Sequence, residues 1–250
     1  MEKLNKNRVV ISLNETTSTN SELKKLQQEK PLPEGSIVMA DFQTMGRGQV
    51  GNSWFSGNGN NLLFSLLLYP DCVAAKDQFI ISRIVSLALK RLLDNFIDNV
   101  TIKWPNDIYW NDKKVAGILI ENSLIGRQID YCIIGVGLNV NENNFPSALL
   151  NPISMKQVTG KEYDRQELLE TFNRELFLLY RELQISNKNN IESKYMQYLY
   201  RKDGTHSFED KDGPFNGRIK DVLSSGHLII ETYPQERERV YAFKEVSFIV

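Results

Sequence analysis

The sequence predicts an α+β protein that ends in a small β-rich unit. Strand-like and helix-like segments are interspersed over residues 1–200, whereas short β segments separated by turns follow from Arg201 onward. A length of 250 residues with 41% apolar content also allows a full buried core. We therefore expect a large domain over residues 1–200 and a small domain over residues 201–250.

The strands of the large domain are predicted from apolar runs of strand length bounded by turn signals. Asn111-Asp112-Lys113, for example, indicates the turn of a hairpin. In chain order we expect strands over Val9–Leu13, Ser36–Phe42, Asn61–Tyr69, Val100–Trp104, Ile108–Trp110, Lys114–Glu121 and Tyr131–Val140.

The helices are predicted from apolar spacing and from capping residues. Thr19 and Glu22 have the spacing of a capping box, with simple N-capping by Ser18 or Thr19 as the alternative. Asp164 and Glu167 cap a later helix in the same way. A long segment between them has Ile80, Ile84, Leu87 and Arg91 at helical spacing, and its dense apolar content predicts burial. We expect helices over Thr19–Gln28, Lys76–Ile97, Asp164–Gln184 and Ile191–Leu199.

The C-terminal unit is divided by turn-forming residues at Asp212-Gly213-Pro214, Ser225-Gly226 and Tyr233-Pro234. Strands are expected between these breaks, over Phe215–Leu223, His227–Thr232 and Val240–Val250. A unit of about 50 residues is marginal alone, so we expect it to pack on the larger domain.

The composition argues against several classes of protein. The formal net charge of -1 does not favour bulk binding of nucleic acid, and no apolar run is long enough to span a membrane, so a soluble, cytoplasmic protein is expected. Cys72 and Cys132 lie in apolar contexts and are expected to be buried free thiols of a reducing compartment. With only His206 and His227 and no cysteine cluster, a zinc site is not expected.

The segment from Phe42 to Trp54 is the most informative part of the chain. It has three glycines and a single cation, Arg47, and it ends in a tryptophan. Glycines let backbone N–H groups approach an anion closely, and a guanidinium is a planar donor suited to phosphate or carboxylate. We interpret this segment as a loop that closes over a charged small molecule.

Two further elements carry groups that can act on such a molecule. In Lys103-Trp104-Pro105-Asn106-Asp107, the lysine can stabilise negative charge and the aspartate can bind a metal or accept a proton. Lys114 begins a strand that contains Gly117, where a glycine indicates close approach by a ligand or by another backbone. The alternatives are a hairpin shoulder with a surface lysine for the first element and an exposed hairpin lysine for Lys114.

Small polar residues and further glycines complete the set of candidates. Thr17-Ser18-Thr19-Asn20 offers hydroxyl and amide groups at a helix start, where simple N-capping is the alternative. Gly135 and Gly137 lie in an apolar strand that ends near Asn139, and the space beside them should be filled by a ligand or, alternatively, by a packed helix.

Taken in this order, these motifs resemble the biotin–protein ligases over about Thr16 to Asn141. The chain is similar to the short form that has no N-terminal DNA-binding domain. The resemblance implies a class II synthetase-like mixed β-sheet with packed helices, followed by a small SH3-like β barrel. It also implies a two-step reaction in which biotin and ATP, with Mg²⁺, give biotinyl-5′-AMP, and biotin then passes to one lysine of a biotin carboxyl carrier protein.

The resemblance assigns roles residue by residue. Arg47, Lys103, Asp107 and Lys114 are the expected catalytic residues, with the metal ligands unknown. The biotin site is expected to comprise Ser18, Thr19, Asn20, Gln43, Gly46, Arg47, Lys114, Gly117 and Gly135. The ATP or AMP site is expected to comprise Arg47, Gly48, Trp54, Lys103, Asn106 and Asn139. We expect no DNA and no membrane as partners, and a homodimer is possible.

One departure from the family pattern concerns the glycine loop. Many members read Gly-Arg-Gly-Arg-x-Gly-Arg, whereas Gln49 and Asn52 stand at the later arginine positions here. We therefore expect weaker retention of the adenylate than in the arginine-rich relatives.

The alternatives to a biotin ligase are a lipoate–protein ligase, which shares the catalytic fold, and a nucleic-acid adaptor that uses the C-terminal unit. The mixed signs of charge in that unit do not favour the adaptor.

Overall fold

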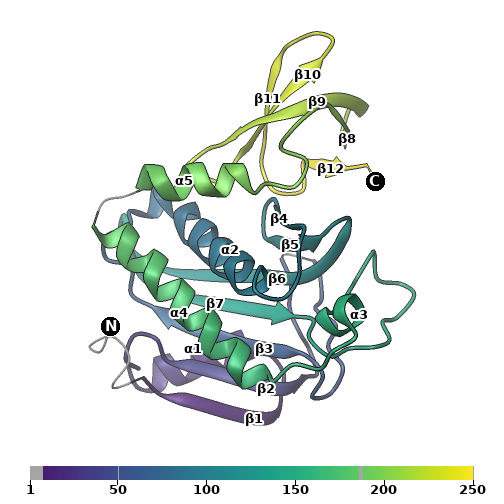
Figure 1. Cartoon of the computed structure of the whole chain (residues 1–250). Coiled ribbons are helices and arrows are strands. Elements are labelled where there is room, and N and C mark those ends of the chain that lie inside the picture. The colour runs from purple at the N-terminus through teal and green to yellow at the C-terminus, as the bar shows by residue number, and fades with distance from the viewer. Residues whose placement is uncertain (1–7, 50, 186–187, 250) are drawn as a thin grey trace.

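A seven-stranded mixed sheet forms the larger part of the molecule (Figure 1). The structure is a computed structural model that describes residues 8–49, 51–185 and 188–249. The strand order is β1-β2-β3-β7-β6-β5-β4, with β1 and β2 parallel and the other neighbours antiparallel. These strands are β1 (Val10–Thr16), β2 (Ile37–Gln43), β3 (Leu62–Leu68), β4 (Val100–Lys103), β5 (Asp107–Trp110), β6 (Lys113–Ile125) and β7 (Gln128–Leu138).

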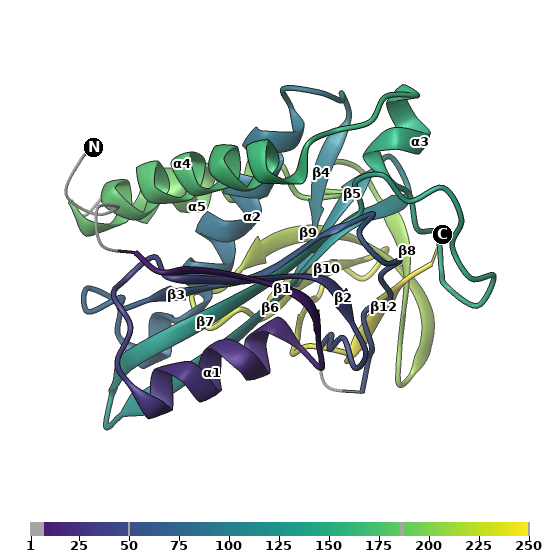
Figure 2. The same ribbon diagram turned by 90° about the horizontal axis from the view of Figure 1, so that it is seen from below.

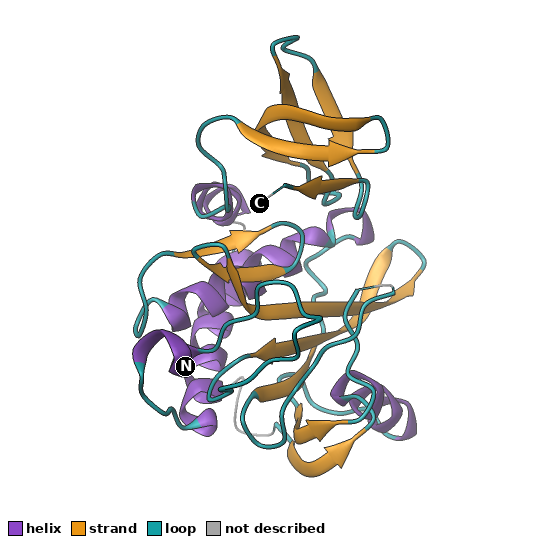
Figure 3. Ribbon diagram, turned by 90° about the vertical axis from the view of Figure 1, so that its right-hand side faces the viewer, coloured by secondary structure: helices purple, strands orange, loops and turns teal. Residues whose placement is uncertain are grey.

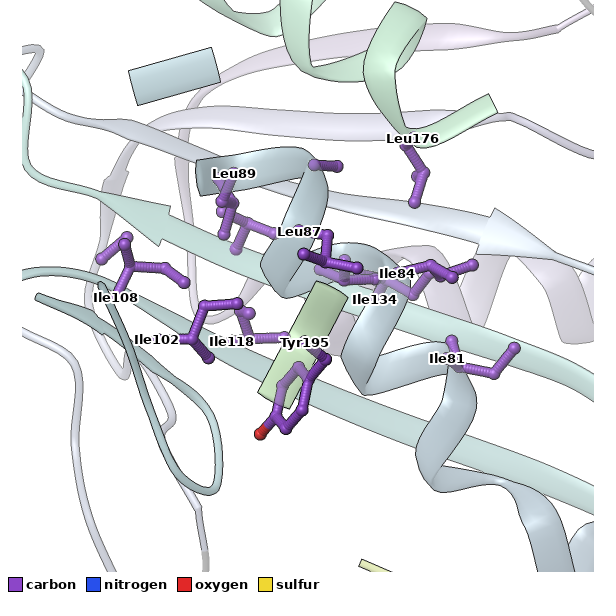
Figure 4. Close-up of a cluster of buried hydrophobic side chains, with 14 of the residues drawn as sticks. Ile81, Ile84, Leu87, Leu89, Ile102, Ile108, Ile118, Ile134, Leu176 and Tyr195 are labelled. Atoms are coloured by element: carbon purple, nitrogen blue, oxygen red, sulfur yellow. The ribbon is translucent and has the colours of Figure 1, made fainter. Parts of the chain in front are cut away.

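Helices cover both faces of this sheet (Figure 2). On one face lie α2 (Phe79–Leu93) and α4 (Arg165–Gln184), which pack on each other, and on the opposite face lies α1 (Thr19–Glu29). Because both faces are covered, every residue of β3 is buried, which explains its unbroken apolar run. The core between the sheet, α2 and α4 is built from aliphatic side chains such as Ile84, Leu87, Ile134 and Leu176 (Figure 4).

A smaller, antiparallel sheet follows (Figure 3). Its strand order is β11-β10-β9-β8-β12. Its strands are β8 (His206–Asp210), β9 (Gly213–Val222), β10 (Leu228–Tyr233), β11 (Glu238–Tyr241) and β12 (Val246–Phe248), and α5 (Lys188–Gln197) precedes it. The α+β class with a mixed sheet and a small β-rich C-terminal part is confirmed. The division into domains at residues 200 and 201 stays a prediction.

The small sheet is tied to α2 and to the turn after β4. The guanidinium of Arg83 on α2 is buried, pairs with Glu192 of α5 and donates to the backbone carbonyls of Val222 and Leu223 at the end of β9. Gly226 lies in the turn that follows β9. Its carbonyl accepts a hydrogen bond of 2.9 Å from the indole N–H of Trp104. The small sheet therefore contacts the Lys103–Asp107 element directly.

Two local predictions hold for physical reasons that the structure shows, and one predicted helix is shorter than expected. Asp164 caps α4 by accepting hydrogen bonds from the backbone N–H groups of Gln166 and Glu167. The β5–β6 hairpin turns at Asn111, whose φ of 50° lies in the left-handed region that asparagine tolerates. The segment expected as one helix over residues 76–97 is instead a short 3₁₀ turn, Ala75–Asp77, followed by α2.

Other predictions were wrong. The expected capping box of Thr19 and Glu22 is absent. Ser18 stands at the N-cap of α1 without a side-chain capping bond, and the Thr19 hydroxyl donates to Gln43. The short α3 (Met155–Thr159), capped by Ser154 and Gln157, was not predicted. Neither was β8.

Two corrections concern the end of the chain and one cysteine. The strand expected over residues 240–250 is split into β11 and β12, and its last residue, Val250, lies outside the described part. Cys72 is exposed because it lies in the turn after β3, whereas Cys132 is buried as expected. Among the described residues, no helix is long and apolar enough to cross a membrane.

Candidate functional site

The glycine loop folds back on itself as a small hairpin, here called the flap (residues 44–54 without Val50, which lies outside the described residues). The Trp54 N–H donates to the carbonyl of Gly46, and the Gly48 N–H donates to that of Asn52, both at 2.9 Å. A Cβ on Gly46 would lie 2.4 Å from the carbonyl oxygen of Trp54, and Gly51 has a φ of 83°. These two glycines are therefore needed for the hairpin itself.

The start of α1 lines one end of the site with buried polar groups. Ser18, Thr19 and Asn20 are each at most 4% exposed. The backbone N–H of Thr19 donates to Oε1 of Gln43, at the end of β2, at 2.8 Å. The hydroxyl of Ser65 lies within hydrogen-bond distance of Thr19 Oγ1, at 2.8 Å, and of Asn20 Oδ1, at 2.5 Å. Helix α1 and strands β2 and β3 thus place a connected polar cluster at the sheet surface.

The strand glycines make room for side chains of the chain itself. Gly117 on β6 is paired with Gly137 on β7, and the indole of Trp54 lies over both. A Cβ on Gly117 would meet Trp54 Cζ3 at 2.7 Å. Likewise, a Cβ on Gly135 would meet Asn20 Oδ1 at 2.3 Å. Beside Gly135 the helix alternative holds, because Asn20 of α1 fills the space, whereas beside Gly117 and Gly137 the space is filled by the Trp54 side chain of the flap.

This contact gives a testable prediction. In Gly137→Ala, the new methyl group would lie 2.3 Å from Trp54 Cε2, so the indole ring must move away from its position over Gly117 and Gly137. We expect the free energy of unfolding to fall by about 1 kcal/mol, at the low end for overpacking because the flap is half-exposed. Urea denaturation measures this. Combining the change with Trp54→Ala should remove most of the extra cost, and an equal loss in both backgrounds would contradict the assignment.

Lys114 and Asp107 form an ion pair beside the Trp54 ring. Their Nζ and Oδ1 atoms are 2.7 Å apart, and Nζ lies 5.4 Å from the centre of the indole. A bulge in the pairing of β5 with β6 lets Ile108 face Ala116 while Tyr109 faces Lys114, and bulges commonly redirect side chains in this way. A lysine ammonium is thus held in the site, next to a carboxylate and an indole ring.

The turn that carries Asp107 is fixed to β6. The side-chain amide of Asn106 donates to the carbonyl of Ile118 at 2.7 Å, and the Ile118 N–H donates back to the carbonyl of Asn106 at 2.9 Å. These two bonds keep Asp107 in register with Gly117, its partner in the β5–β6 pairing.

Lys103 lies apart from this ion pair. Its ammonium donates to the hydroxyl of Tyr109 at 2.9 Å and lies 5.3 Å from the ring centre of Phe248, on β12. Burial lowers the pKa of Lys103 from its ordinary value, and the charge of Asp107 opposes this shift. The small sheet therefore builds part of the surroundings of this lysine.

Asn139 has a structural network of its own. It is 3% exposed, its side-chain amide donates to the carbonyl of Ile153 at 3.1 Å, and its carbonyl accepts from the N–H of Met155. It thereby fixes the segment that returns past Lys114, whose own N–H donates to Asn151.

Most of the predicted residues surround one pocket, with an empty volume of about 630 Å³ that is partly open to solvent. The pocket is lined by the predicted residues Ser18, Thr19, Asn20, Gln43, Arg47, Gly48, Trp54, Asn106, Asp107, Lys114, Gly117 and Gly135. Three predicted residues do not line it: Gly46, Lys103 and Asn139. The role assigned to each predicted residue stays a prediction, whether or not the residue lines the pocket.

A second, more apolar cleft of about 1090 Å³, also open to solvent, continues from this pocket. The two share Gln49, Asn106, Ile118 and Leu119, and the cleft runs past α2 to Phe243 and Lys244 in the C-terminal part. A molecule bound in this cleft would lie next to the ion pair of Asp107 and Lys114.

The pocket is also lined by residues that were not among the predicted site residues: Gln49, Asn52, Ser53, Ile118, Leu119, Val136 and Gly137. Two further residues, outside the lining, hold predicted ones in place. Ser65 joins Thr19 to Asn20, and Glu121 accepts hydrogen bonds from both Arg47 and Asn20. Ser65 could have been found as a lone hydroxyl within the apolar run Leu62–Leu68. Glu121 follows the apolar run of residues 115–120 within β6, but nothing in the sequence indicates that the flap reaches it.

The residues present do not form a cage for a resident metal ion. Among the residues that the structure describes, no group of three or more His, Cys, Asp or Glu side chains is placed to hold one. The chemistry of the pocket instead depends on amides and on two cations, Lys114 and Arg47, each of which is paired with a carboxylate. Such a set suits a small molecule that has a polar, hydrogen-bonding head and an anionic tail.

Comparisons with known proteins agree with this geometry. Residues 12–139 match the model of the biotin/lipoate A/B protein ligase family. The chain is 32% identical over 208 residues to the bifunctional ligase/repressor BirA of Bacillus subtilis, covering 80% of this chain and 62% of BirA. It is 32% identical over 162 residues to biotin–[acetyl-CoA-carboxylase] ligase of Paracoccus denitrificans, covering 62% of this chain and 66% of that protein. The chain thus spans less than two thirds of the length of these relatives.

A solved structure covers the whole fold. The biotin protein ligase of Aquifex aeolicus in complex with biotin and ATP matches with a TM-score of 0.79 and 26% identity, over 96% of this chain and 97% of that one. The family match spans β1 to the end of β7, which are the elements that carry the flap, the ion pair and the strand glycines. This chain is a member of the biotin/lipoate A/B protein ligase family.

Proposed function

We propose that this protein is a biotin–protein ligase, which uses ATP to activate biotin and transfers it to a lysine of a biotin carboxyl carrier protein. The observation that carries the proposal is the position of the Lys114–Asp107 ion pair in the pocket, between the polar end at the start of α1 and the flap. The Paracoccus relative is a biotin–[acetyl-CoA-carboxylase] ligase, the Bacillus relative is a bifunctional ligase/repressor, and the Aquifex structure is a biotin protein ligase in complex with biotin and ATP.

In the first step, an oxygen of the biotin carboxylate attacks the α-phosphorus of ATP, the new C–O–P bond forms, and pyrophosphate leaves. Negative charge builds on the phosphoryl and carboxyl oxygens in the transition state. Lys114 is placed to stabilise that charge at the centre of the pocket, and Arg47 can do so from the flap. The nucleotide arrives as its magnesium complex, a substrate form in which Mg²⁺ is held mainly by phosphate oxygens.

The head group of biotin is assigned to the polar end of the pocket. Its ureido ring has N–H donors and a carbonyl acceptor, and Ser18, Thr19, Asn20 and Gln43 offer matching groups there. The Trp54 indole now occupies the groove over Gly117 and Gly137, so the ring must shift as the ligand enters. A closed flap then keeps water from the mixed anhydride.

In the second step, the ε-amine of the carrier lysine attacks the carbonyl carbon of the anhydride, an amide bond forms, and AMP leaves. A free lysine is protonated near neutral pH, with a pKa of about 10.4, so the amine must lose a proton before it attacks. Asp107 is placed to orient the amine and to accept that proton. The apolar cleft that reaches Asn106 gives the carrier domain a route to this position.

Direct binding measurements distinguish a biotin ligase from a lipoate ligase. Isothermal titration with each acid, in the presence of a non-hydrolysable ATP analogue, should give saturable binding of biotin and none of lipoate. Preference for lipoate would overturn the proposal. Nucleic acid is not expected to bind, because the basic side chains Arg218, Lys220 and Arg239 of the small sheet are paired with acidic ones.

Removal of the flap cation gives a further prediction. Arg47→Gly adds backbone freedom and removes the lone guanidinium of the loop, so the flap should retain the adenylate poorly. We expect activated biotin to escape and to label lysines of bystander proteins. Mass spectrometry of a mixture that contains serum albumin and the carrier domain measures this. A labelling pattern like that of the wild type would count against a retaining role for Arg47.

A further inference from the structure

Glu121, on β6, touches both the flap and the polar end of the pocket. Its carboxylate accepts hydrogen bonds from Nη1 and Nη2 of Arg47, at 3.1 and 2.8 Å, and from Nδ2 of Asn20, at 2.7 Å. The side chains of Glu121 and Arg47 are 31% and 43% exposed, so the pair is open to competition from water and from dissolved anions. This carboxylate joins two parts of the site that come from distant parts of the chain.

The pair neutralises the charge that the flap would offer to a nucleotide. Arg47 is the only Lys or Arg between Phe42 and Trp54 in the sequence. Its guanidinium is engaged by both oxygens of one carboxylate, a paired arrangement that a phosphate group can also adopt. A phosphate can therefore take the same donors only when Glu121 gives them up.

We propose that Glu121 is a positioning residue that holds Arg47, and with it the flap, in the ligand-free protein and releases it to the anionic part of the nucleotide. The proposal rests on the proposed function. Arg47 exchanges one anion for another, so its guanidinium stays paired, and the released Glu121 carboxylate, which is 31% exposed, is left to water and to the Asn20 amide. Nucleotide binding and flap seating are thereby coupled through a single carboxylate.

The geometry allows this role to be separated from the support of Asn20. The amide of Asn20 is also held by the Ser65 hydroxyl at Oδ1 and by the carbonyl of Leu119 at Nδ2, at 3.3 Å. In Glu121→Gln, the new amide oxygen can still accept from Asn20, whereas the charge that holds Arg47 is lost. The substitution therefore loosens the flap and leaves the polar end of the pocket in place.

The first measurement is hydrogen exchange of the ligand-free protein. In Glu121→Gln, the hydrogen-bonded N–H groups of Gly48 and Trp54 should exchange about two- to five-fold faster, the size expected for loss of a half-exposed ion pair. The matched control is Glu170→Gln on α4. The Glu170 carboxylate accepts hydrogen bonds of 2.7 and 2.9 Å from Arg8, so this change removes an ion pair far from the flap in sequence. The control should leave exchange in the flap unchanged. Equal exchange in the wild type and Glu121→Gln would overturn the proposal.

The second measurement is calorimetric binding of α,β-methylene ATP in the presence of biotin. The variant should bind this nucleotide several-fold more tightly, because Arg47 no longer has to leave a carboxylate, and its affinity for biotin alone should stay within about two-fold. A merely structural role would weaken both ligands, and that result would contradict the partner exchange. If the wild type bound neither ligand, the ligase assignment would fail, and this outcome is distinct from an unchanged variant.

Discussion

Lys114→Ala is expected to reduce formation of biotinyl-AMP by about 10²- to 10³-fold, the effect of losing one preorganised donor to developing charge. Lys114 is held in the pocket by Asp107, at 2.7 Å, and its ammonium lies beside the Trp54 ring. Release of pyrophosphate in a single turnover, together with mass detection of the adenylate, measures the first step alone. Biotin affinity should fall less than the rate, because the charge that Lys114 stabilises grows mainly in the transition state.

The matched control is Lys113→Ala, the neighbouring lysine on β6, which is exposed and does not line the pocket. This control should form the adenylate at nearly the wild-type rate, and both variants should give the circular dichroism of the folded protein. Normal adenylate synthesis by Lys114→Ala would remove this lysine from the mechanism.

Arg83→Met is expected to lower the free energy of unfolding by about 2 kcal/mol, because it leaves a buried backbone acceptor without its donor, whereas the partner Glu192 is 39% exposed and can be solvated. Arg83 is 2% exposed, and its removal leaves the carbonyl of Val222 buried without this donor. The guanidinium carbon of Arg83 lies 5.6 Å from the ring centres of both Phe79 and Tyr195, and the unbranched methionine side chain fills part of this space, so the loss reports mainly the guanidinium. Urea denaturation measures the change.

The control for Arg83 comes from the same helix. Arg91 makes a longer contact of 3.7 Å with Glu175 and is 33% exposed, so Arg91→Met should cost less than about 1 kcal/mol. Similar losses for the two variants would contradict the view that Arg83 anchors the small sheet on α2.

The order of elements could be predicted because each one carries a local signal. The alternation of apolar runs and turns located the seven strands of the large sheet, and Asp164 correctly marked the start of α4. Signals that depend on the tertiary fold could not be read in this way. Thr19, for example, has the sequence context of a cap, but its hydroxyl is oriented toward Gln43 and Ser65, which are distant in sequence. Short elements such as α3 have too few residues to show a period.

The site could be predicted where its motifs lie at the ends of strands that are neighbours in the sheet. Lys114, Asp107 and Arg47 line one pocket as expected, because β5 and β6 are adjacent and the flap folds over β6 and β7. The direction of a side chain beyond its strand was not predictable. Lys103 faces Tyr109 and Phe248 instead of the pocket, and the pairing of Glu121 with Arg47 depends on how the flap folds back.

The most direct test is a transfer reaction followed by intact-mass analysis. The purified chain is incubated with biotin, ATP, Mg²⁺ and a biotin carboxyl carrier domain, with parallel reactions that omit ATP or replace the acceptor lysine by arginine. The account predicts that the carrier gains the mass of one biotinyl group only in the complete reaction. A carrier of unchanged mass in that reaction, with ATP unconsumed, would contradict it.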